Sequence, residues 1–168
     1  MRLPALTLLL TLPFLSPALS LPTTSSPSSV IKTTKITPSY WRATFSDPPL
    51  NIQADAFFRD FYSLVDQITS DPDVKVVVFD ASPKSSFWSN HVDLVNPLDQ
   101  TLWPGNARYW ESIEKLVKAP VLTIAAIRGI AANAGAEIAA VLDVRFASRE
   151  KGVFVQGEVG FGEYDPHY

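Results

Sequence analysis

The sequence predicts one α/β domain in which buried strands alternate with amphipathic helices. Apolar runs at 74–79 and 121–127 have the length and β-branched content of buried strands. The segments between such runs are long enough to be the crossovers that join parallel strands. A chain of 168 residues, 46% of them apolar and 18% charged, can bury a core of this kind.

The predicted elements begin with a strand at 40–45, "YWRATF", followed by the turn "SDPPLN". A helix is expected over 54–69, because apolar residues recur there at three- and four-residue spacing: Phe57, Phe61, Leu64, Val65 and Ile68. The later elements are, in order, a strand at 74–79, a loop at 80–94, a helix at 110–118, a strand at 121–127, a turn at 128–129, about ten residues of helix from Asn133, and two further buried strands, "VRFAS" and "GVFV".

The first 39 residues are predicted to precede the domain. Residues 1–20 carry one charge, Arg2, and a proline-interrupted apolar run too short to span a membrane, and they end in Ala18-Leu19-Ser20. They predict a secretory signal peptide, and with it secretion or the endoplasmic reticulum. The alternative is a mis-assigned start and a mitochondrial or peroxisomal protein. Residues 21–39 are rich in Ser, Thr and Pro and are predicted to be a linker, so that the domain spans 40–168.

Composition excludes several functions. The net charge of −3 provides no basic patch for nucleic acid. The absence of cysteine excludes disulfides, zinc–thiolate sites and a cysteine nucleophile, and only His91 and His167 could supply imidazole.

The turn "RGIAANAGAE" is the first candidate site. A strand, a glycine-containing loop and a helix start leave free backbone N–H groups, and the small residues allow a ligand to approach them. Tight packing of the helix on the strand is the alternative. No P-loop and no G-x-G-x-x-G motif occurs.

Two glutamates, Glu137 and Glu158, lie within or beside apolar sequence. A half-buried carboxylate is costly unless it is paired or used, and two of them near one pocket can act as acid and base. The alternative is a structural ion pair with Arg145 or Lys151.

The stretch "SNHVD" places Ser, His and Asp together, but no G-x-S-x-G elbow occurs, which argues against a serine hydrolase. A metal site from His91, Asp93, Asp165 and His167 matches no usual ligand spacing.

Four segments together resemble the crotonase (enoyl-CoA hydratase/isomerase) superfamily, and they cover nearly all of residues 40–162. "WRATFSDPPLNIQ" and "DPDVKVVVFDA" are similar to its first strands, and "FWSNHVDL" to its F-F-S-A-G-A-D-L segment. "IAAIRGIAANAGAEIAAVLDVRFAS" and "VFVQGEVGFG" are similar to A-x-x-x-G-x-x-x-G-G-G-x-E-L-A-x-x-C-D-x-x-x-A and F-x-x-P-E-x-x-x-G.

The resemblance implies a crotonase-like ββα spiral core, assembled in the family as trimers or pairs of trimers. It implies an acyl-CoA thioester substrate and no metal or cofactor other than the coenzyme A of the substrate. The backbone N–H groups of Val92 and Ala134 would form an oxyanion hole, and Glu137 and Glu158 would handle water and proton.

His91, Asp93 and Gly135 would contact the substrate by the same resemblance. The sequence also departs from the family pattern. His91 replaces a glycine, which strains a backbone that needs positive φ, "ANAGAE" keeps one glycine of three, and Gly157 replaces a proline. The spacing from Glu137 to Glu158 is one residue longer than usual. The pattern ends soon after Gly162, so we expect a domain that is incomplete at its C-terminus, which leaves the oligomer open.

The resemblance predicts an enzyme that adds water to an enoyl-CoA thioester or shifts its double bond. The alternative is an inactive crotonase-like fragment that acts as a binding module. Because one oxyanion hole serves several reactions in this family, thioester hydrolysis and decarboxylation also stay open.

Overall fold

A computed structural model of the chain describes residues 28–102, 105 and 107–161. The predicted signal peptide lies outside these residues. The elements in chain order are β1 (Ile31–Thr37), β2 (Tyr40–Phe45), α1 (Asp55–Ser70), β3 (Val76–Ala81), β4 (Phe87–Ser89), α2 (Ala107–Lys118), β5 (Leu122–Ile127), β6 (Ile130–Ala132), α3 (Ala134–Val141), β7 (Val144–Ala147), β8 (Val153–Val155) and α4 (Glu158–Phe161).

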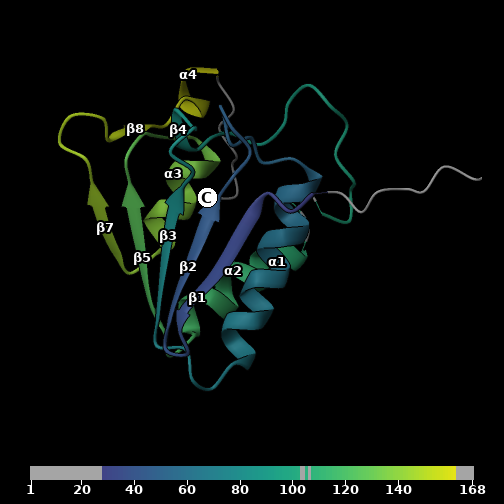
Figure 1. Cartoon of the computed structure of the whole chain (residues 1–168). Coiled ribbons are helices and arrows are strands. Elements are labelled where there is room, and N and C mark those ends of the chain that lie inside the picture. Colours follow the sequence, from purple (N-terminus) through teal and green to yellow (C-terminus); the bar gives the residue numbers. More distant parts are fainter. Residues whose placement is uncertain (1–27, 103–104, 106, 162–168) are drawn as a thin grey trace, which may run out of the picture.

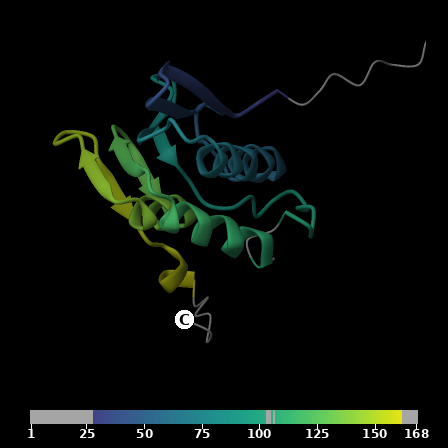
Figure 2. The same cartoon turned by 90° about the horizontal axis from the view of Figure 1, so that it is seen from below.

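A five-stranded sheet in the order β1-β2-β3-β5-β7 forms one layer of the fold. β1 is antiparallel to β2, and the other four strands are parallel, as the apolar runs predicted. α1 and α2 lie side by side on one face of this sheet (Figures 1 and 2). The predicted α/β class is confirmed.

A smaller parallel sheet in the order β4-β6-β8 lies beyond the carboxyl ends of the large-sheet strands. Each of its three strands follows a strand of the large sheet, since β3 leads to β4, β5 to β6 and β7 to β8, and each pair is followed by a helix (Figure 1). The chain is therefore a series of ββα units, which is the architecture that the resemblance implied.

The core lies between the large sheet and α1. Alternate side chains of β2 are buried, as expected for a strand with one covered face. The five apolar residues predicted to form one face of α1 are all buried, and so are Phe58 and Tyr62. Aromatic rings fill much of this core; Phe57 and Phe61 stack with ring centroids 5.9 Å apart. The helix prediction is confirmed to within one residue at each end.

The predicted linker is wrong for residues 31–37, which form β1. All the side chains of β1 except that of Ile31 are exposed. The exposed positions are occupied mainly by Lys and Thr, which gives β1 the polar composition of a linker. Backbone hydrogen bonds to β2 hold it instead, and Asp60 Oδ2 accepts from the backbone N–H groups of Val30 and Ile31 at 2.6 and 3.0 Å. Strand formation here depends mainly on the backbone ladder, since Ile31 is the one β1 side chain that is buried in the core.

Two short strands, β4 and β6, were not predicted, because three residues are too few to show a periodicity. β7 and β8 were predicted as strands buried in the core. Both strands are present, but the prediction of burial is wrong, since three of the four β7 residues and all three β8 residues are exposed.

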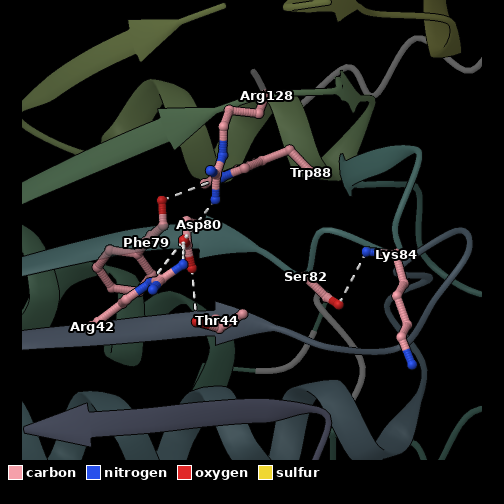
Figure 3. A network of polar contacts seen from close by, with 8 residues as sticks. All are labelled: Arg42, Thr44, Phe79, Asp80, Ser82, Lys84, Trp88 and Arg128. Atoms are coloured by element: carbon pink, nitrogen blue, oxygen red, sulfur yellow. Dashed lines mark hydrogen bonds and ion pairs between the residues drawn. The ribbon is translucent and has the colours of Figure 1, made fainter.

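A polar network joins the ends of the large strands (Figure 3). Asp80 is 3% exposed, and its carboxylate accepts from Arg42 Nε at 2.8 Å, Thr44 Oγ1 at 2.7 Å and Arg128 Nη2 at 3.3 Å. The hydrogen bond from Arg42 and the charge of Asp80 raise the pKa of the Arg42 guanidinium. The network therefore ties β2, β3 and the β5–β6 turn together with paired, and not isolated, buried charge.

Candidate functional site

The candidate residues meet at one edge of the small sheet. β4, β6 and β8 are parallel, so their carboxyl ends lie together, and the segments that follow them are 90–93, 133–137 and 156–158. Those segments include the residues predicted for the oxyanion hole, for acid–base chemistry and for substrate contact: His91, Val92, Asp93, Ala134, Gly135, Glu137 and Glu158. Figure 1 shows α3, β4 and α4 gathered at this end of the molecule.

The first amide of the predicted oxyanion hole belongs to the loop after β4. Gln53 N–H donates to His91 O at 3.0 Å, and Asp93 N–H donates to Gln53 O at 3.0 Å. In this parallel pairing the N–H of Val92 points away from Gln53. It donates to no acceptor within the described part of the chain.

His91 does not have the strained backbone that was expected for a residue replacing glycine. Among the non-glycine residues described, only Asn51 and Asn133 have positive φ. The His91 ring Nδ1–H donates to the carbonyl oxygen of Val92. The first loop therefore accommodates a side chain at this position, and the expectation of strain there is wrong.

Asp93 serves the local turn. Its Oδ1 accepts from the backbone N–H groups of Val95 and Asn96 at 2.9 and 3.0 Å, and its Oδ2 accepts from Asn96 Nδ2 at 2.8 Å. The bonds from Asn96, followed by the one from Val95, lower the pKa of the Asp93 carboxyl. These contacts explain why Asp93 occurs here without a ligand, while its predicted contact with substrate stays a prediction.

The second amide belongs to Ala134, the first residue of α3. Asn133, which precedes it, has φ 54° and ψ −126°, and its carbonyl accepts from Glu137 N–H at 3.0 Å. The N–H of Ala134 donates to none of the described residues, as expected in the first turn of a helix. Both amides predicted for the oxyanion hole are thus unbonded in the part of the chain that is described.

Gly135 allows α3 to lie against β4. A Cβ at this position would lie 2.2 Å from the carbonyl oxygen of Ser89, closer than any side chain tolerates. The alternative prediction of tight helix–strand packing is therefore correct for Gly135, and its contact with substrate stays a prediction. The same approach brings the amide segments of α3 and of the loop after β4 together.

The two glutamates lie near each other. Glu137 is in the first turn of α3 and is exposed, contrary to the expected half-buried position, and its Oε1 accepts from Gln156 Nε2 at 3.1 Å. Glu158 begins α4 and is partly buried, and its Oε2 is buried with no hydrogen-bond partner among the described residues. Although water reaches Glu137, neighbouring protein atoms shield enough of its carboxylate to raise its pKa; the Gln156 bond opposes this shift, and the charge of Glu158 adds to it.

A structural ion pair does not account for these glutamates. Arg145 Nη1 donates to the carbonyl oxygens of Ala139, Ala140 and Leu142 at the end of α3, where a cation is favourable. Lys151 lines a groove of about 830 Å³ at the opposite ends of the small-sheet strands, together with Arg128. Among the described residues, no salt bridge includes Glu137 or Glu158.

The weaker candidates gain no support. Asp165 and His167 lie outside the described residues, and the residues described contain no group of three or more His, Cys, Asp or Glu that could hold a metal. No helix in that part of the chain is long and apolar enough to cross a membrane.

Three residues of the site were not predicted: Gln53, Asn133 and Gln156. Gln53 holds the loop after β4, and Gln156 holds Glu137. An asparagine before a predicted helix is a usual N-cap, but at Asn133 no such cap bond forms, so that signal would have suggested the wrong contact.

Stacked ββα units around a two-sheet core, with the candidate site at the end of the small sheet, define a crotonase-like α/β protein. The family model for enoyl-CoA hydratase/isomerase matches residues 38–168. The chain belongs to this family, and the resemblance noted in the sequence is confirmed. The comparison with curated proteins gave no match.

Solved structures agree, with 373 matching chains. A protein of Streptomyces avermitilis assigned as an enoyl-CoA hydratase is 33% identical with a TM-score of 0.68, and the match covers 82% of this chain and 52% of that one. DspI of Pseudomonas aeruginosa is 25% identical with a TM-score of 0.68, covering 83% and 58%. An enoyl-CoA hydratase of Geobacillus kaustophilus, 24% identical with a TM-score of 0.69, supports the fold alone. The chain spans about half the length of these structures.

Proposed function

We propose that this protein adds water across the double bond of a 2-enoyl-CoA thioester. The observation that carries the proposal is the state of Glu158: it has a buried carboxylate oxygen with no partner among the described residues, and it lies beside a second carboxylate. A buried polar atom without a partner is costly in a site that serves structure alone. Family membership supplies the substrate class.

The two free amides would bind the thioester carbonyl oxygen. As water adds to C3, the electrons of the double bond move through C2 towards that oxygen, which becomes an enolate oxygen. Val92 and Ala134 would donate their N–H groups to it. Donors that are fixed in advance on developing charge contribute several kcal/mol to catalysis, commonly about 3 kcal/mol for each donor.

The glutamates would move the protons. Glu137 would take a proton from water as the water oxygen bonds to C3, and Glu158 would deliver a proton to C2. The product is a 3-hydroxyacyl thioester, and proton exchange between the neighbouring carboxylates restores the starting state. The raised pKa of Glu137 suits a group that must accept a proton.

Glu158→Gln tests this assignment in the full 168-residue chain. Glutamine keeps the shape of the side chain but cannot deliver the proton, so hydration of a short 2-enoyl-CoA should fall at least about 100-fold. The reaction is followed by loss of the absorbance of the conjugated thioester. Thioester binding, measured by calorimetry with a saturated acyl-CoA, should stay within about threefold of the wild-type affinity.

The matched control is Glu111→Gln, which changes an exposed glutamate on α2. It should hydrate at the wild-type rate. Hydration by Glu158→Gln at the same rate as this control would contradict the role assigned to Glu158.

Binding of an acyl thioester without turnover is a second candidate function. The exposure of Glu137 favours it, because a carboxylate open to bulk water is poorly suited to directing a single water molecule. Saturable binding of acyl-CoA by a folded wild-type chain that gives no hydration would support this candidate and contradict the hydratase.

A further inference from the structure

Asn133 joins the two halves of the site through its backbone and its side chain. Its N–H donates to Val155 O at 2.7 Å, which ties it to the end of β8. Its carbonyl accepts from Glu137 N–H at 3.0 Å in the first turn of α3. Its side-chain Oδ1 accepts from Gly157 N–H at 2.7 Å, at the residue immediately before Glu158. One residue thus contacts both of the segments that carry the glutamates.

The contact between Asn133 and Gly157 needs both residues to depart from the family pattern described above. A glycine at 133 would have no side chain to accept the bond. A proline at 157 has no N–H to donate. A Cβ at position 157 would also lie only 3.1 Å from Asn133 Oδ1, so a larger residue would press on the acceptor. The two departures are therefore coupled through one hydrogen bond.

The backbone of Asn133 also indicates that the side chain has a purpose. A φ of 54° with ψ of −126° is a conformation that glycine adopts freely and other residues rarely do. Asparagine tolerates positive φ better than most residues, but it is still strained relative to glycine. Such strain persists where surrounding contacts determine it, and the three bonds of Asn133 are those contacts.

We infer that Asn133 is a positioning residue, whose side-chain oxygen fixes the start of α4, and with it Glu158, beside the Ala134 amide. The inference rests on the proposed function for its effect on catalysis, but the contact itself can be tested without activity. Asn133 touches no reacting atom in this scheme. It acts by holding Glu158 in position relative to the Ala134 amide, and the misplacement of such a group can lower a rate by a large factor.

Asn133→Gly is the first test, in the full chain. Glycine removes the acceptor and relieves the backbone strain, so the two effects on stability oppose each other and the fold should be retained. Exchange of the Gly157 amide with solvent should accelerate at least about tenfold. The kcat for hydration should fall about tenfold or more with KM little changed, because substrate binding is left intact while Glu158 loses its fixed position.

Asn133→Asp is the conservative control, because its carboxylate can accept from Gly157 N–H and tolerates positive φ. It should keep the protection of the Gly157 amide. Gly157→Pro removes the donor instead, and in combination with Asn133→Gly it should lower kcat no further than the more damaging single change, since both remove the same bond.

Equal Gly157 exchange in the wild type and in Asn133→Gly would overturn the inference, as would additive losses of kcat in the double variant. A wild-type chain that gives no hydration would contradict the proposed function. The exchange measurement would then still decide the contact: protection that is lost in Asn133→Gly and kept in Asn133→Asp supports it, and any other pattern rejects it.

Discussion

An inner strand of the large sheet, β2, and the outer strand of the small sheet, β8, differ in how they are covered. In the large sheet, Trp41, Ala43 and Phe45 of β2 are at most 1% exposed, packed under α1. In the small sheet, Val153, Phe154 and Val155 of β8 are 46%, 50% and 42% exposed. The sequence predicted a strand for both "YWRATF" and "VFV". The difference lies in what packs on them, and the sequence of a strand does not state that.

The candidate site belongs to the less covered region. α3 and α4 carry the glutamates. α3 packs on β4 and β6, whose buried side chains join the core, while the outer strand β8 leaves all three of its side chains exposed. The large sheet, α1 and α2 enclose most of the core, and the segments that follow the small-sheet strands carry the amides and carboxylates. Regions of low burial open more easily, which is usual where a site must admit a ligand.

Removing one aromatic side chain from each region is the strongest way to break this comparison. Phe61 on the buried face of α1 is fully enclosed, so Phe61→Ala should lower the free energy of unfolding by about 3–5 kcal/mol. Phe154 on β8 is 50% exposed, so Phe154→Ala should change the free energy of unfolding by no more than about 1 kcal/mol. Urea unfolding followed by tryptophan fluorescence measures both. Similar losses for the two variants would mean that β8 is covered in solution.

A smaller effect is expected from adding one methyl group within the small-sheet region, where α3 lies against β4. In Gly135→Ala the new Cβ would meet Ser89 O at 2.2 Å, so α3 must move from β4. The free energy of unfolding should fall by about 1–3 kcal/mol, and any hydratase activity should fall with it.

Gly160→Ala is the matched control, because a Cβ added there would have no atom within 4 Å and the residue is helical. It should leave stability unchanged or raise it by up to about 1 kcal/mol. Thermal unfolding of the three proteins measures the contrast. Equal melting temperatures for Gly135→Ala and the wild type would show that α3 does not lie this close to β4.

Sequence patterns predicted the elements that are long enough to show a hydrophobic periodicity or a continuous apolar run. The apolar face of α1 and the β-branched run of β3 extend over several residues, and both elements were found. β4 and β6 have three residues each and show no period. β1 was mistaken for a linker because its partner strand, and not its own composition, makes it a strand.

Sequence predicted which candidate residues lie together better than it predicted their surroundings. Glu137, Glu158, Val92 and Ala134 do come to one edge, because the ends of parallel strands meet there. The exposure of Glu137 and the contact from Asn133 to Gly157 could not be read from spacing. The contact joins residues 24 positions apart in the chain, and the exposure depends on how such distant segments are placed, which only the three-dimensional structure gives.

The smallest expected effect is on the pH dependence of stability, and it concerns the charge of the less covered region. The folded protein raises the pKa of Glu137 above its ordinary value of 4.5, mainly because protein atoms displace water from the carboxylate. The folded state therefore binds this proton more tightly than the unfolded chain does. The contribution to stability is fully present below pH 4.5 and is lost as pH rises through the higher folded pKa.

Glu137→Gln removes this ionisation and keeps an oxygen that can accept from Gln156. Its melting temperature relative to the wild type should therefore increase as pH is raised from about 4 to about 8. Glu114→Gln on α2 should show the opposite pH dependence of melting temperature, because the hydrogen bond and charge of Lys118 lower the pKa of Glu114. That variant should lose stability relative to the wild type as pH rises from below 4.5. The melting temperatures of the two variants, each relative to the wild type, should therefore shift in opposite directions as pH rises. A shift in the same direction would show that protein atoms do not shield Glu137 in solution, and would contradict its assignment as the carboxylate that accepts a proton.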